Sequence, residues 1–478
     1  MLNLNRQLKF SYFTGIYDAI IPKNHLLRKI AEHIDFSFVN KLMEECYCID
    51  FGRPAYEPEL ILKLLFLKFL YDLSDREVIS RCQTDMAFKF FLGLNPEDEV
   101  PDASLLAKFR TLRITEDGLQ EFLNETVRQA IDHKVIKSKT IIVDSTHSRS
   151  KHTPQTPTQI LREMTKNLRK EIHRTQNEIC NVFPEKPTVE DDIFEEIDYT
   201  KSLVIALEKV DLVSEKAQKL LLKVQKTLEL PNLVELQCTN DEDATIGHKS
   251  EDDDFFGYKN HIAMTEEGII TGLSVTNGTA ADNKEFETIV NQTLNTGVTV
   301  SDIAGDKAYS TSDILKFGID KNINIISKLK ENVGSKEFND DYISFNKDAD
   351  TYECKNSCLA KKNKVRKNSY ISYSFHRCDC DKCPFKKQCL GDNSDGYKQI
   401  LNNVNYDIFE DQRNFETTEH FKQIHKIRWK IEQQNSHLKN QYGLNITYGT
   451  GLWSMKAQSF LTAITANIVK ITKLVATV

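Results

Sequence analysis

The chain has 478 residues, which is beyond the length at which one hydrophobic core usually keeps growing, so we expect several domains or large insertions. The net charge of −7 and the pI near 6.0 exclude a uniformly basic protein, but charges screen over about 10 Å, so a local basic face could still bind a polyanion. The longest apolar run, LILKLLFLKFLY, is too short to span a bilayer, and the first residues lack the apolar stretch of a signal peptide; we therefore expect a cytoplasmic protein with no membrane segment.

Residues 1–125 are predicted to be helical. An apolar helix is expected over 59–71, and Ser74 followed by Glu77 forms a capping-box pattern that would open the next helix. The helix after that carries the basic residues Lys108, Arg110 and Arg113. These side chains are candidates for contacts with DNA in a helical DNA-binding domain. A helical bundle with a charged outer face explains the same pattern.

The segment TIIVDSTHS contains the first candidate catalytic acid. Thr140 to Val143 are β-branched and apolar, as in a buried strand, and the polar Ser145 is expected to end that strand. Asp144 would then lie at the end of the strand and face a cleft. The alternative is that Asp144 is a turn or helix-capping residue, since aspartate is common in both places.

Residues 151–250 are predicted to form a helical hairpin inserted after this strand, with acidic segments at 185–198 and 241–254. The helical spacing of apolar residues identifies two helices, a first with Leu161, Met164, Leu168 and Ile172 and a second with Leu203, Leu207, Val210, Ala217, Leu221, Val224 and Leu228, whose pattern is broken by Ser214. We expect the insertion to pack on itself or on a second subunit. A DNA-contacting arm is the alternative, supported by RKEIHR alone.

The segment GYKNHIAMTEEGIITGLSVTNG predicts a β-hairpin, because β-branched alternation lies on both sides of Glu266-Glu267-Gly268. Its strands would lie next to the Asp144 strand. Lys259 and His261 could then lie near the site, and Lys259 is a candidate DNA contact, although a lysine at a strand end is often only solvated.

A second candidate acid follows a second predicted strand, in VTVSDIAGDKAYS. Ile303 and Ala304 belong to the strand, Gly305 is small, and Asp306 comes directly after it. As with Asp144, a turn or capping role is the alternative.

Residues 335–405 are predicted to form a basic, cysteine-rich insertion. Ten Lys or Arg against two Asp lie within 355–388, and six of the 11 cysteines lie between 354 and 389. An odd number of cysteines favours thiols or metal ligation over a disulfide framework. The candidate ligands of a structural zinc ion are Cys378, Cys380, Cys383 and Cys389. Reduced thiols without a metal are the alternative.

The segment HKIRWKIEQQNSHLK is predicted to be one helix with a polar and an apolar face. His425, Arg428, Glu432 and Lys439 would lie within roughly 60° of one another, beside an apolar stripe that contains Ile431. A carboxylate flanked by cations suits metal-dependent phosphoryl transfer, in which the acid holds a divalent ion and the bases hold the phosphate. The alternative is a surface helix with ion pairs, Arg428 with Glu432 among them.

The chain resembles bacterial insertion-sequence transposases of the DDE type, which have an RNase H-like core, and its N-terminal region is InsH-like. The family signature Tyr-x2-Arg-x3-Glu-x6-Lys corresponds here to His425, Arg428, Glu432 and Lys439, so three of its four positions match. The blocks GRPAYEPELILKLLFLKFLYDLSDREV and GHKSEDDDFFGYKNHIAMTEEGIITGLSVTNG also fit, and the cysteine-rich insertion resembles one that several members carry. His425 replaces the tyrosine, which puts the role of that phenol in doubt, although imidazole can still donate to a phosphate or stack.

This resemblance implies an α/β fold with a mixed-sheet, RNase H-like catalytic core made of 138–150, 255–330 and 415–475. It implies that Asp144, Asp306 and Glu432 are catalytic and hold Mg²⁺ or Mn²⁺, and that Arg428 and Lys439 hold phosphates. The expected partner is double-stranded DNA, as element ends and target, bound by a homodimer associated with the nucleoid. An inactive DNA-binding descendant and a metal-dependent nuclease that cuts without joining are the alternatives.

Overall fold

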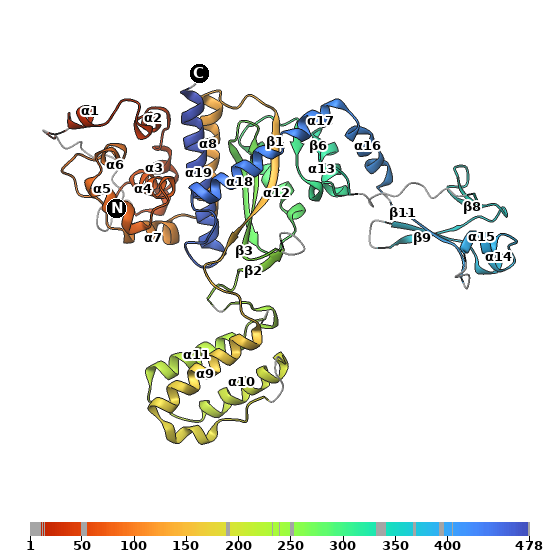
Figure 1. Ribbon diagram of the computed structural model, residues 1–478, viewed down its shortest axis with the longest axis horizontal. Coiled ribbons are helices and arrows are strands. Elements are labelled where there is room, and N and C mark those ends of the chain that lie inside the picture. The colour runs from red at the N-terminus through yellow and green to blue at the C-terminus, as the bar shows by residue number, and fades with distance from the viewer. Residues whose placement is uncertain are drawn as a thin grey trace. The chain divides into compact units, whose positions relative to one another are not determined.

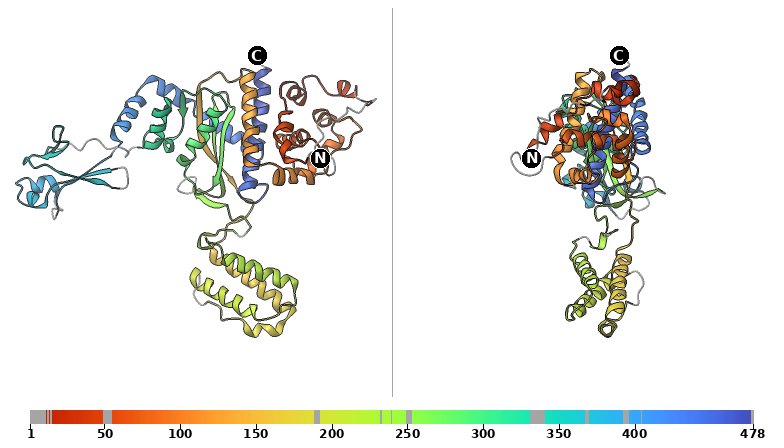
Figure 2. Two further views of the ribbon diagram at one scale, coloured as in Figure 1. Left: turned by 180° about the vertical axis from the view of Figure 1, so that it is seen from behind. Right: turned by 90° about the vertical axis from the view of Figure 1, so that its left-hand side faces the viewer.

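The computed structural model describes residues 11, 13, 15–48, 55–187, 192–231, 233–238, 240–248, 253–330, 341–366, 370–391, 396–403 and 405–476. Parts of both acidic segments and of both sequence blocks quoted for the family lie outside these residues. Contacts divide the chain into unit 1 (Met1–Lys137, Ser145–Val298 and Glu432–Val478) and unit 2 (Ser138–Asp144 and Thr299–Ile431). Figures 1 and 2 show the elements of each.

Unit 1 begins with helices, and no strand occurs in the described residues before 138. The helices are α1 (Ile16–Ile20), α2 (Leu26–His33), α3 (Phe38–Leu42), η1 (Glu44–Cys46), α4 (Pro58–Leu70), α5 (Asp75–Thr84), α6 (Met86–Phe91), α7 (Ser104–Lys108), η2 (Phe109–Arg113) and α8 (Glu116–Asp132). Helix α4 is buried on nearly all sides, which explains its apolar sequence. The predicted capping box is confirmed, because Ser74 Oγ accepts from Glu77 N and Glu77 Oε2 accepts from Ser74 N.

The sheet residues of unit 1 come from the second half of β1 (Thr140–Arg149) and from β2 (Thr245–His248), β3 (Asp254–Thr265) and β4 (Ile270–Asn277). β3 pairs with β2 and β4, both antiparallel, and lies next to β1. The predicted hairpin is confirmed: β3 and β4 are joined by a turn in which Gly268 has φ +88°, a conformation that favours glycine.

Helices α8, α12 (Phe286–Asn295) and α19 (Leu452–Val475) pack against this sheet, and α8 and α19 lie side by side (Figures 1 and 2). Asp282–Lys284 form a short 3-10 helix, η5, before α12. Asn467, fully buried in α19, binds the edge of β4 twice: its Oδ1 accepts from Ile270 N and its Nδ2 donates to Ile270 O, both at 2.8 Å. A buried amide paired in this way fixes the long helix on the sheet.

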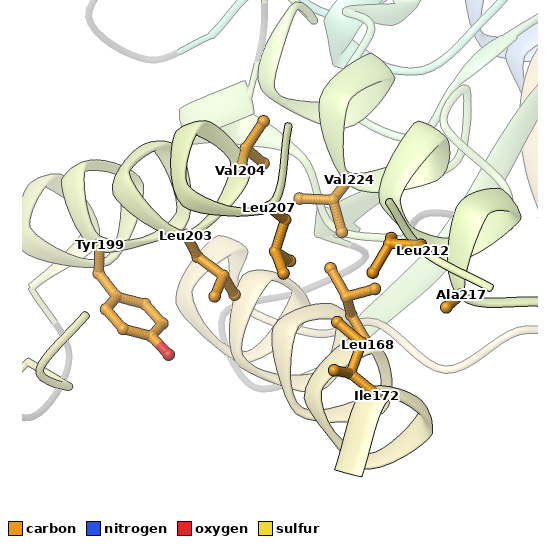
Figure 3. Packing of buried hydrophobic residues seen from close by; sticks show 9 residues of the cluster. All are labelled: Leu168, Ile172, Tyr199, Leu203, Val204, Leu207, Leu212, Ala217 and Val224. Atoms are coloured by element: carbon orange, nitrogen blue, oxygen red, sulfur yellow. The ribbon is translucent and has the colours of Figure 1, made fainter. Parts of the chain in front are cut away.

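The insertion in unit 1 consists of three main helices, so the prediction of a two-helix hairpin is wrong. Its elements are α9 (Pro157–Thr175), η3 (Asn177–Val182), α10 (Ile193–Glu208), α11 (Glu215–Leu228) and η4 (Leu233–Glu235). The predicted second helix breaks because Ser214 caps α11, accepting from Ala217 N, while Val213 N donates to Gln176 Oε1. Most of the predicted apolar residues still pack together in a separate core that includes Leu168, Leu203 and Leu207 (Figure 3), but Leu161 belongs to another cluster and Val210 to neither.

Unit 2 contains the first half of β1 and two further strands, β5 (Asp302–Ala304) and β6 (Asn324–Ile326). β1 pairs with β5 and β5 with β6, all parallel. The helices of this part are η6 (Lys307–Tyr309), α13 (Ser312–Lys321), α16 (Tyr406–Glu416) and α17 (Glu419–Lys426). Helix α16 is tied to β6 because Gln412 Nε2 donates to the carbonyls of Ile325 and Ser327, each at 3.0 Å. Parallel and antiparallel pairs together make a mixed sheet, as predicted.

Residues 341–366, 370–391 and 396–403 of unit 2 build a small β-rich part, named the cysteine subdomain. Its elements are β7 (Ile343–Asn346), β8 (Thr351–Cys354), β9 (Lys361–Arg366), β10 (Tyr370–Ser374), α14 (Arg377–Asp381), α15 (Lys386–Leu390) and β11 (Gln399–Asn403). β7 pairs with β8, and β10 pairs with β9 and β11, all antiparallel. Tyr352 and Tyr373 meet edge to face at 5.1 Å in its core.

The element α18 (Trp429–Gln441) contains the boundary between the two units. Of the helices that the structure describes, none combines the length and the apolar character that a bilayer span requires.

Candidate functional site

Asp144 lies within β1 and Asp306 just after β5, at matching positions of two neighbouring parallel strands in unit 2. Ile142 pairs with Ala304, and each aspartate lies two residues further along its own strand direction. Because parallel strands advance at the same rate per residue, the register places the backbone of Asp144 and that of Asp306 at corresponding positions along the two strands. Both side chains are half-buried.

The first strand does not end at Val143, so the prediction that Asp144 ends its strand is wrong. β1 continues to Arg149 because its second half has partners within unit 1. Asn260 Nδ2 donates to Thr146 O at 3.3 Å, and Arg149 N donates to Asn445 O at 2.9 Å. Asp144 therefore lies in mid-strand, just past the part of β1 that pairs with β5.

The second strand ends as predicted, with Asp306 directly after β5 and Gly305. Asp306 Oδ1 accepts from Ala308 N at 2.9 Å and caps η6, while Ser327 Oγ donates to the carbonyl oxygen of Asp306. A Cβ atom on Gly305 would lie 2.8 Å from Tyr309 Cδ2 and 3.1 Å from Val143 Cγ2. The small residue is therefore required for the close packing that positions Asp306.

The segment that contains His425, Arg428, Glu432 and Lys439 is not one helix, so that prediction is wrong. Helix α17 ends at Lys426 and α18 begins at Trp429. Between them, Ile427 N, Arg428 N, Lys430 N and Ile431 N each donate to the carbonyl three residues earlier, which tightens the turn. The expected angles between the four polar side chains therefore do not apply across this turn.

His425 lies in a basic part of unit 2. Its ring stacks on Phe421 with centroids 5.7 Å apart. Burial, together with the positive charges of Lys328 and Arg428, lowers the pKa of His425 below its usual value. Sequence reasoning missed Lys328, although it follows the strand β6 just as Asp306 follows β5. Three side chains that can bind phosphate, His425, Lys328 and Arg428, thus gather here.

Glu432 is exposed in the first turn of α18, and Lys439 is half-buried in its last turn. Both belong to unit 1, whereas Asp144 and Asp306 belong to unit 2. Among the described residues, no three or more His, Cys, Asp or Glu side chains are grouped as metal ligands. The donor types nevertheless fit a hard cation, since Asp144, Asp306 and Glu432 offer only carboxylate oxygens.

The basic residues near α7 differ in their surroundings. Lys108 is exposed at the end of α7. Arg110 forms a two-bond ion pair with Asp75, whose Oδ1 also accepts from Lys68 Nζ at 2.7 Å. Burial raises the pKa of Asp75, but the bonds from Arg110 and Lys68 outweigh it and hold the pKa below its usual value. Lys68, Asp75 and Arg110, but not Lys108, line a cavity of about 760 Å³ in unit 1, together with Trp453, whose Nε1 donates to Arg110 O.

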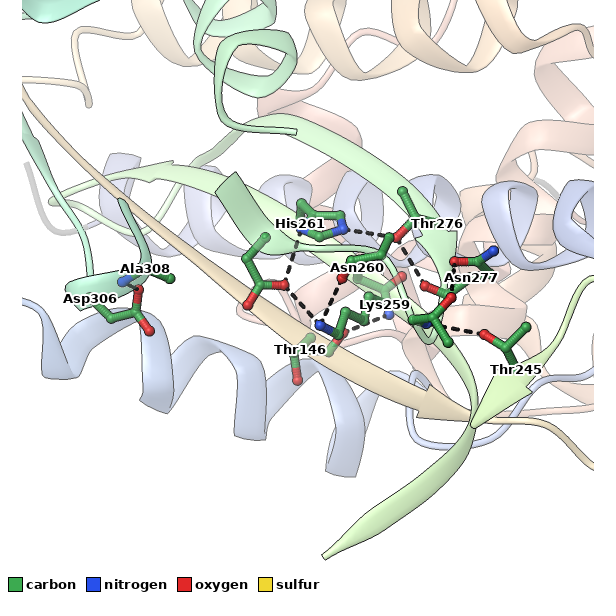
Figure 4. A network of polar contacts seen from close by, with 12 residues as sticks. Thr146, Thr245, Lys259, Asn260, His261, Thr276, Asn277, Asp306 and Ala308 are labelled. Carbon is green, nitrogen blue, oxygen red and sulfur yellow. Dashed lines mark hydrogen bonds and ion pairs between the residues drawn. The ribbon is translucent and has the colours of Figure 1, made fainter. Parts of the chain in front are cut away.

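Lys259 and His261 belong to a polar network on β3 (Figure 4). Lys259 Nζ donates to Ala280 O at 2.9 Å and to Asp282 Oδ1 at 3.2 Å, so two of its three N–H groups are engaged. His261 is fully buried, and its Nε2 lies 2.9 Å from Thr276 Oγ1. Burial lowers the pKa of His261, which favours the neutral ring.

The cysteine subdomain gathers a different set of thiols from the predicted one. The cysteines that line a single cavity are Cys354, Cys358, Cys380, Cys383 and Cys389. Cys378, which the sequence suggested, is exposed and does not line it. The sequence signal for the two additional thiols was the close spacing of Cys354 and Cys358 within the predicted cysteine-rich insertion.

Comparisons with known proteins match the chain to two transposase domain families. The model of a family described as "Transposase domain (DUF772)" matches residues 15–112, and that of a "Transposase DDE domain" matches residues 221–468. The "Uncharacterized protein ORF8 in nfe locus" of Rhizobium meliloti is 34% identical over 125 residues, which are 26% of this chain. The chain spans 59% of the length of that relative. No solved structure matches the chain. Because the second family model covers more than half of the chain, this protein belongs to the DDE transposase family.

Proposed function

We propose that this protein is a DNA transposase that cleaves the ends of an insertion sequence and joins them to target DNA. The observation that carries this proposal is the matched position of Asp144 and Asp306 on neighbouring parallel strands, in a chain of the DDE transposase family. The mixed sheet and the family support an RNase H-like core. Glu432, in the part of the chain that matches the family signature, is proposed as the third acid.

Asp144, Asp306 and Glu432 would hold divalent cations, Mg²⁺ or Mn²⁺, because carboxylate oxygens are the ligands that these ions prefer. When bound, the ions supply an activated water or 3′-hydroxyl and compensate the charge of the leaving oxygen. The chain's contribution at Asp306 is a fixed backbone: the bond from Ser327 Oγ and the cap on η6 leave the second carboxylate oxygen, Oδ2, available for a ligand.

Phosphate binding is proposed for His425, Arg428 and Lys439. The charges of Lys328 and Arg428 near His425 favour a polyanion at this place, and an approaching phosphate would raise the pKa of the ring again. Lys108 is exposed and suited to a contact with the DNA backbone. Arg110 and Lys259 are also proposed to contact DNA. Each would do so with only part of its N–H groups, because Arg110 is already ion-paired with Asp75 and Lys259 with Asp282.

The partner would be double-stranded DNA, and bringing two ends together would require at least two copies of the chain. A protein with this substrate would act at the nucleoid. The proposal does not require a covalent enzyme–DNA intermediate, because water and the 3′-hydroxyl can each attack a phosphate directly.

The test uses purified full-length protein and DNA that carries the element's terminal inverted repeats. Asp144→Asn, Asp306→Asn and Glu432→Gln should each reduce Mg²⁺-dependent nicking to background, while end binding without metal, measured by gel shift, stays within about twofold of wild type. The matched control is Asp320→Asn, which changes an exposed carboxylate on α13 and should keep full activity. Full nicking by any one of the three variants would overturn the assignment of that residue.

A second substrate separates joining from cutting. With a pre-cut end that carries a 3′-hydroxyl, wild-type protein should join the end to a target plasmid. Cutting without joining would replace the proposal by a metal-dependent nuclease. Binding with neither reaction would replace it by an inactive DNA-binding descendant.

A further inference from the structure

The cavity of the cysteine subdomain brings together thiols from two separate turns and from the helix α15. It is about 30 Å³ in volume, and its thiols belong to Cys354, Cys358, Cys380, Cys383 and Cys389. For comparison, one water-sized sphere needs about 10–15 Å³, so there is room for one ion. Among the described residues, no three of these thiols lie close enough together to hold a metal ion, so the binding of an ion requires cysteine side chains to rotate.

Backbone hydrogen bonds close both turns and hold the cysteines of each turn near one another. In the first turn, Cys354 N donates to Cys358 O at 3.0 Å, and Ser357, with φ +55°, donates its N–H to Cys354 O at 2.7 Å. In the second, Cys383 N donates to Cys380 O at 3.2 Å. Closely spaced cysteines on two such turns are the usual way for a chain to supply four thiolates to zinc.

The subdomain is small and needs a stabilising element beyond its apolar core. That core consists of Ile343, Tyr352, Ala360, Tyr373, Phe375 and Ile400, with Cys354, Cys358, Cys380 and Cys389 packed against it. Parts shorter than about 70 residues seldom hold together by apolar burial alone and commonly use disulfides or a metal. None of the 11 cysteines, all of which the structure describes, forms a disulfide.

One cation lies beside the proposed ligands. Four thiolates and one Zn²⁺ carry a net charge of −2; the cavity is lined by Lys386, Lys398 and Asp379, and Lys386 is ion-paired with Asp381 at 2.7 Å, which leaves Lys398 to offset that charge. Lys398 Nζ donates to Cys389 O at 3.0 Å, which places its charge beside one of the proposed ligands. Nearby cations stabilise thiolates over thiols.

We propose that this cavity is a structural zinc site in which four of its five thiolates bind one Zn²⁺. Each ligand loses its proton to solvent on binding, and the metal stays divalent. Cys378 is not a ligand, which changes the set expected from the sequence. The proposal does not depend on the catalytic function, because no residue of this cavity is among the candidate catalytic acids.

Metal analysis of full-length protein purified without added zinc should find about one zinc per chain. Any double substitution among the five cysteines leaves only three thiols, so Cys354→Ser/Cys358→Ser and Cys380→Ser/Cys383→Ser should each lose the zinc. The matched control is Cys48→Ser/Cys378→Ser, which removes two exposed thiols and should keep it. Less than about a tenth of a zinc per wild-type chain, or zinc retained in both double variants, would overturn the proposal.

A measurement on wild-type protein keeps the test decisive if the double variants do not fold. Titration with an organic mercurial that reacts with thiolates should release zinc as about four thiols react. Replacement of the zinc by Co²⁺ should give the intense visible absorption and sulfur-to-metal charge-transfer bands of a tetrahedral thiolate site. Cobalt spectra without charge-transfer bands would mean that the metal is bound elsewhere. Asp144→Asn should leave the zinc content unchanged.

Discussion

Arg110 binds the carboxylate of Asp75 with both of its terminal nitrogens, at 3.0 Å from Nη1 to Oδ1 and at 2.5 Å from Nη2 to Oδ2. The pair connects η2 to α5, and Lys68 of α4 shares the same carboxylate. A side chain that the sequence suggested as a DNA contact thus joins three helices of unit 1.

We expect Asp75→Asn to lower the free energy of unfolding by about 1–3 kcal/mol, because two largely buried cations would lose their counter-charge. Urea unfolding followed by circular dichroism measures this change. Glu99→Gln, which alters an exposed carboxylate of the same helical part, should change stability by less than about 0.5 kcal/mol. Equal effects of the two variants would contradict the structural role of the ion pair.

Gly305→Ala tests the packing that positions Asp306. The new methyl group would lie within 3.1 Å of Tyr309 and Val143, so we expect a loss of about 1–3 kcal/mol in stability. DNA nicking should fall more than stability alone explains, because Asp306 is the next residue. Gly396→Ala is the control, since no heavy atom lies within 4 Å of its added Cβ and its φ is not in the left-handed region. Wild-type nicking in Gly305→Ala would show that this close contact does not position the acid.

The cluster of His425, Lys328 and Arg428 predicts how DNA affinity depends on salt concentration. Arg428→Ala and Lys328→Ala should each weaken DNA binding and each reduce the slope of log affinity against log salt by about 1, the value expected for one lost phosphate contact. Fluorescence anisotropy at several salt concentrations measures both quantities. Lys422→Ala is the control, because Lys422 is ion-paired with Glu419 on α17. An unchanged slope in both variants would place the DNA elsewhere.

Acid should destabilise the protein before its carboxylates titrate. Burial lowers the pKa of His261, His425 and His437, so the unfolded chain takes up protons more readily than the folded protein. The free energy of unfolding should therefore fall as the pH drops below about 6.5, the usual pKa of histidine, toward the lower values of the folded state.

His261→Gln should flatten this pH dependence, whatever its effect on stability at pH 8. Urea unfolding between pH 5.5 and pH 8, referred to the stability at pH 8, measures the slope. The control His133→Gln changes an exposed histidine and should keep the wild-type slope. A wild-type slope in His261→Gln would show that this ring does not contribute.

Much of the local structure follows from the sequence alone. The capping box of Ser74 and Glu77, the hairpin turn at Gly268 and the position of Asp306 directly after a strand were all predicted and are confirmed. Each depends on residues within a few positions of one another, so hydrogen-bonding side chains, glycine and apolar periodicity are sufficient to specify them. Family membership is also visible at this level, because the signature residues lie close together in the chain.

Other features depend on contacts between residues that are far apart in the sequence. β1 continues past Asp144 because Asn260 and Asn445 supply partners, and Arg110 is bound by Asp75, 35 residues earlier. The turn between α17 and α18 likewise lies in a segment whose apolar periodicity suggested one unbroken helix, and the interruption of the pattern at Ser214 did not by itself show that a separate helix, α11, begins there. Periodicity shows which face of an element is buried, but only the tertiary structure determines where its backbone groups find hydrogen-bond partners.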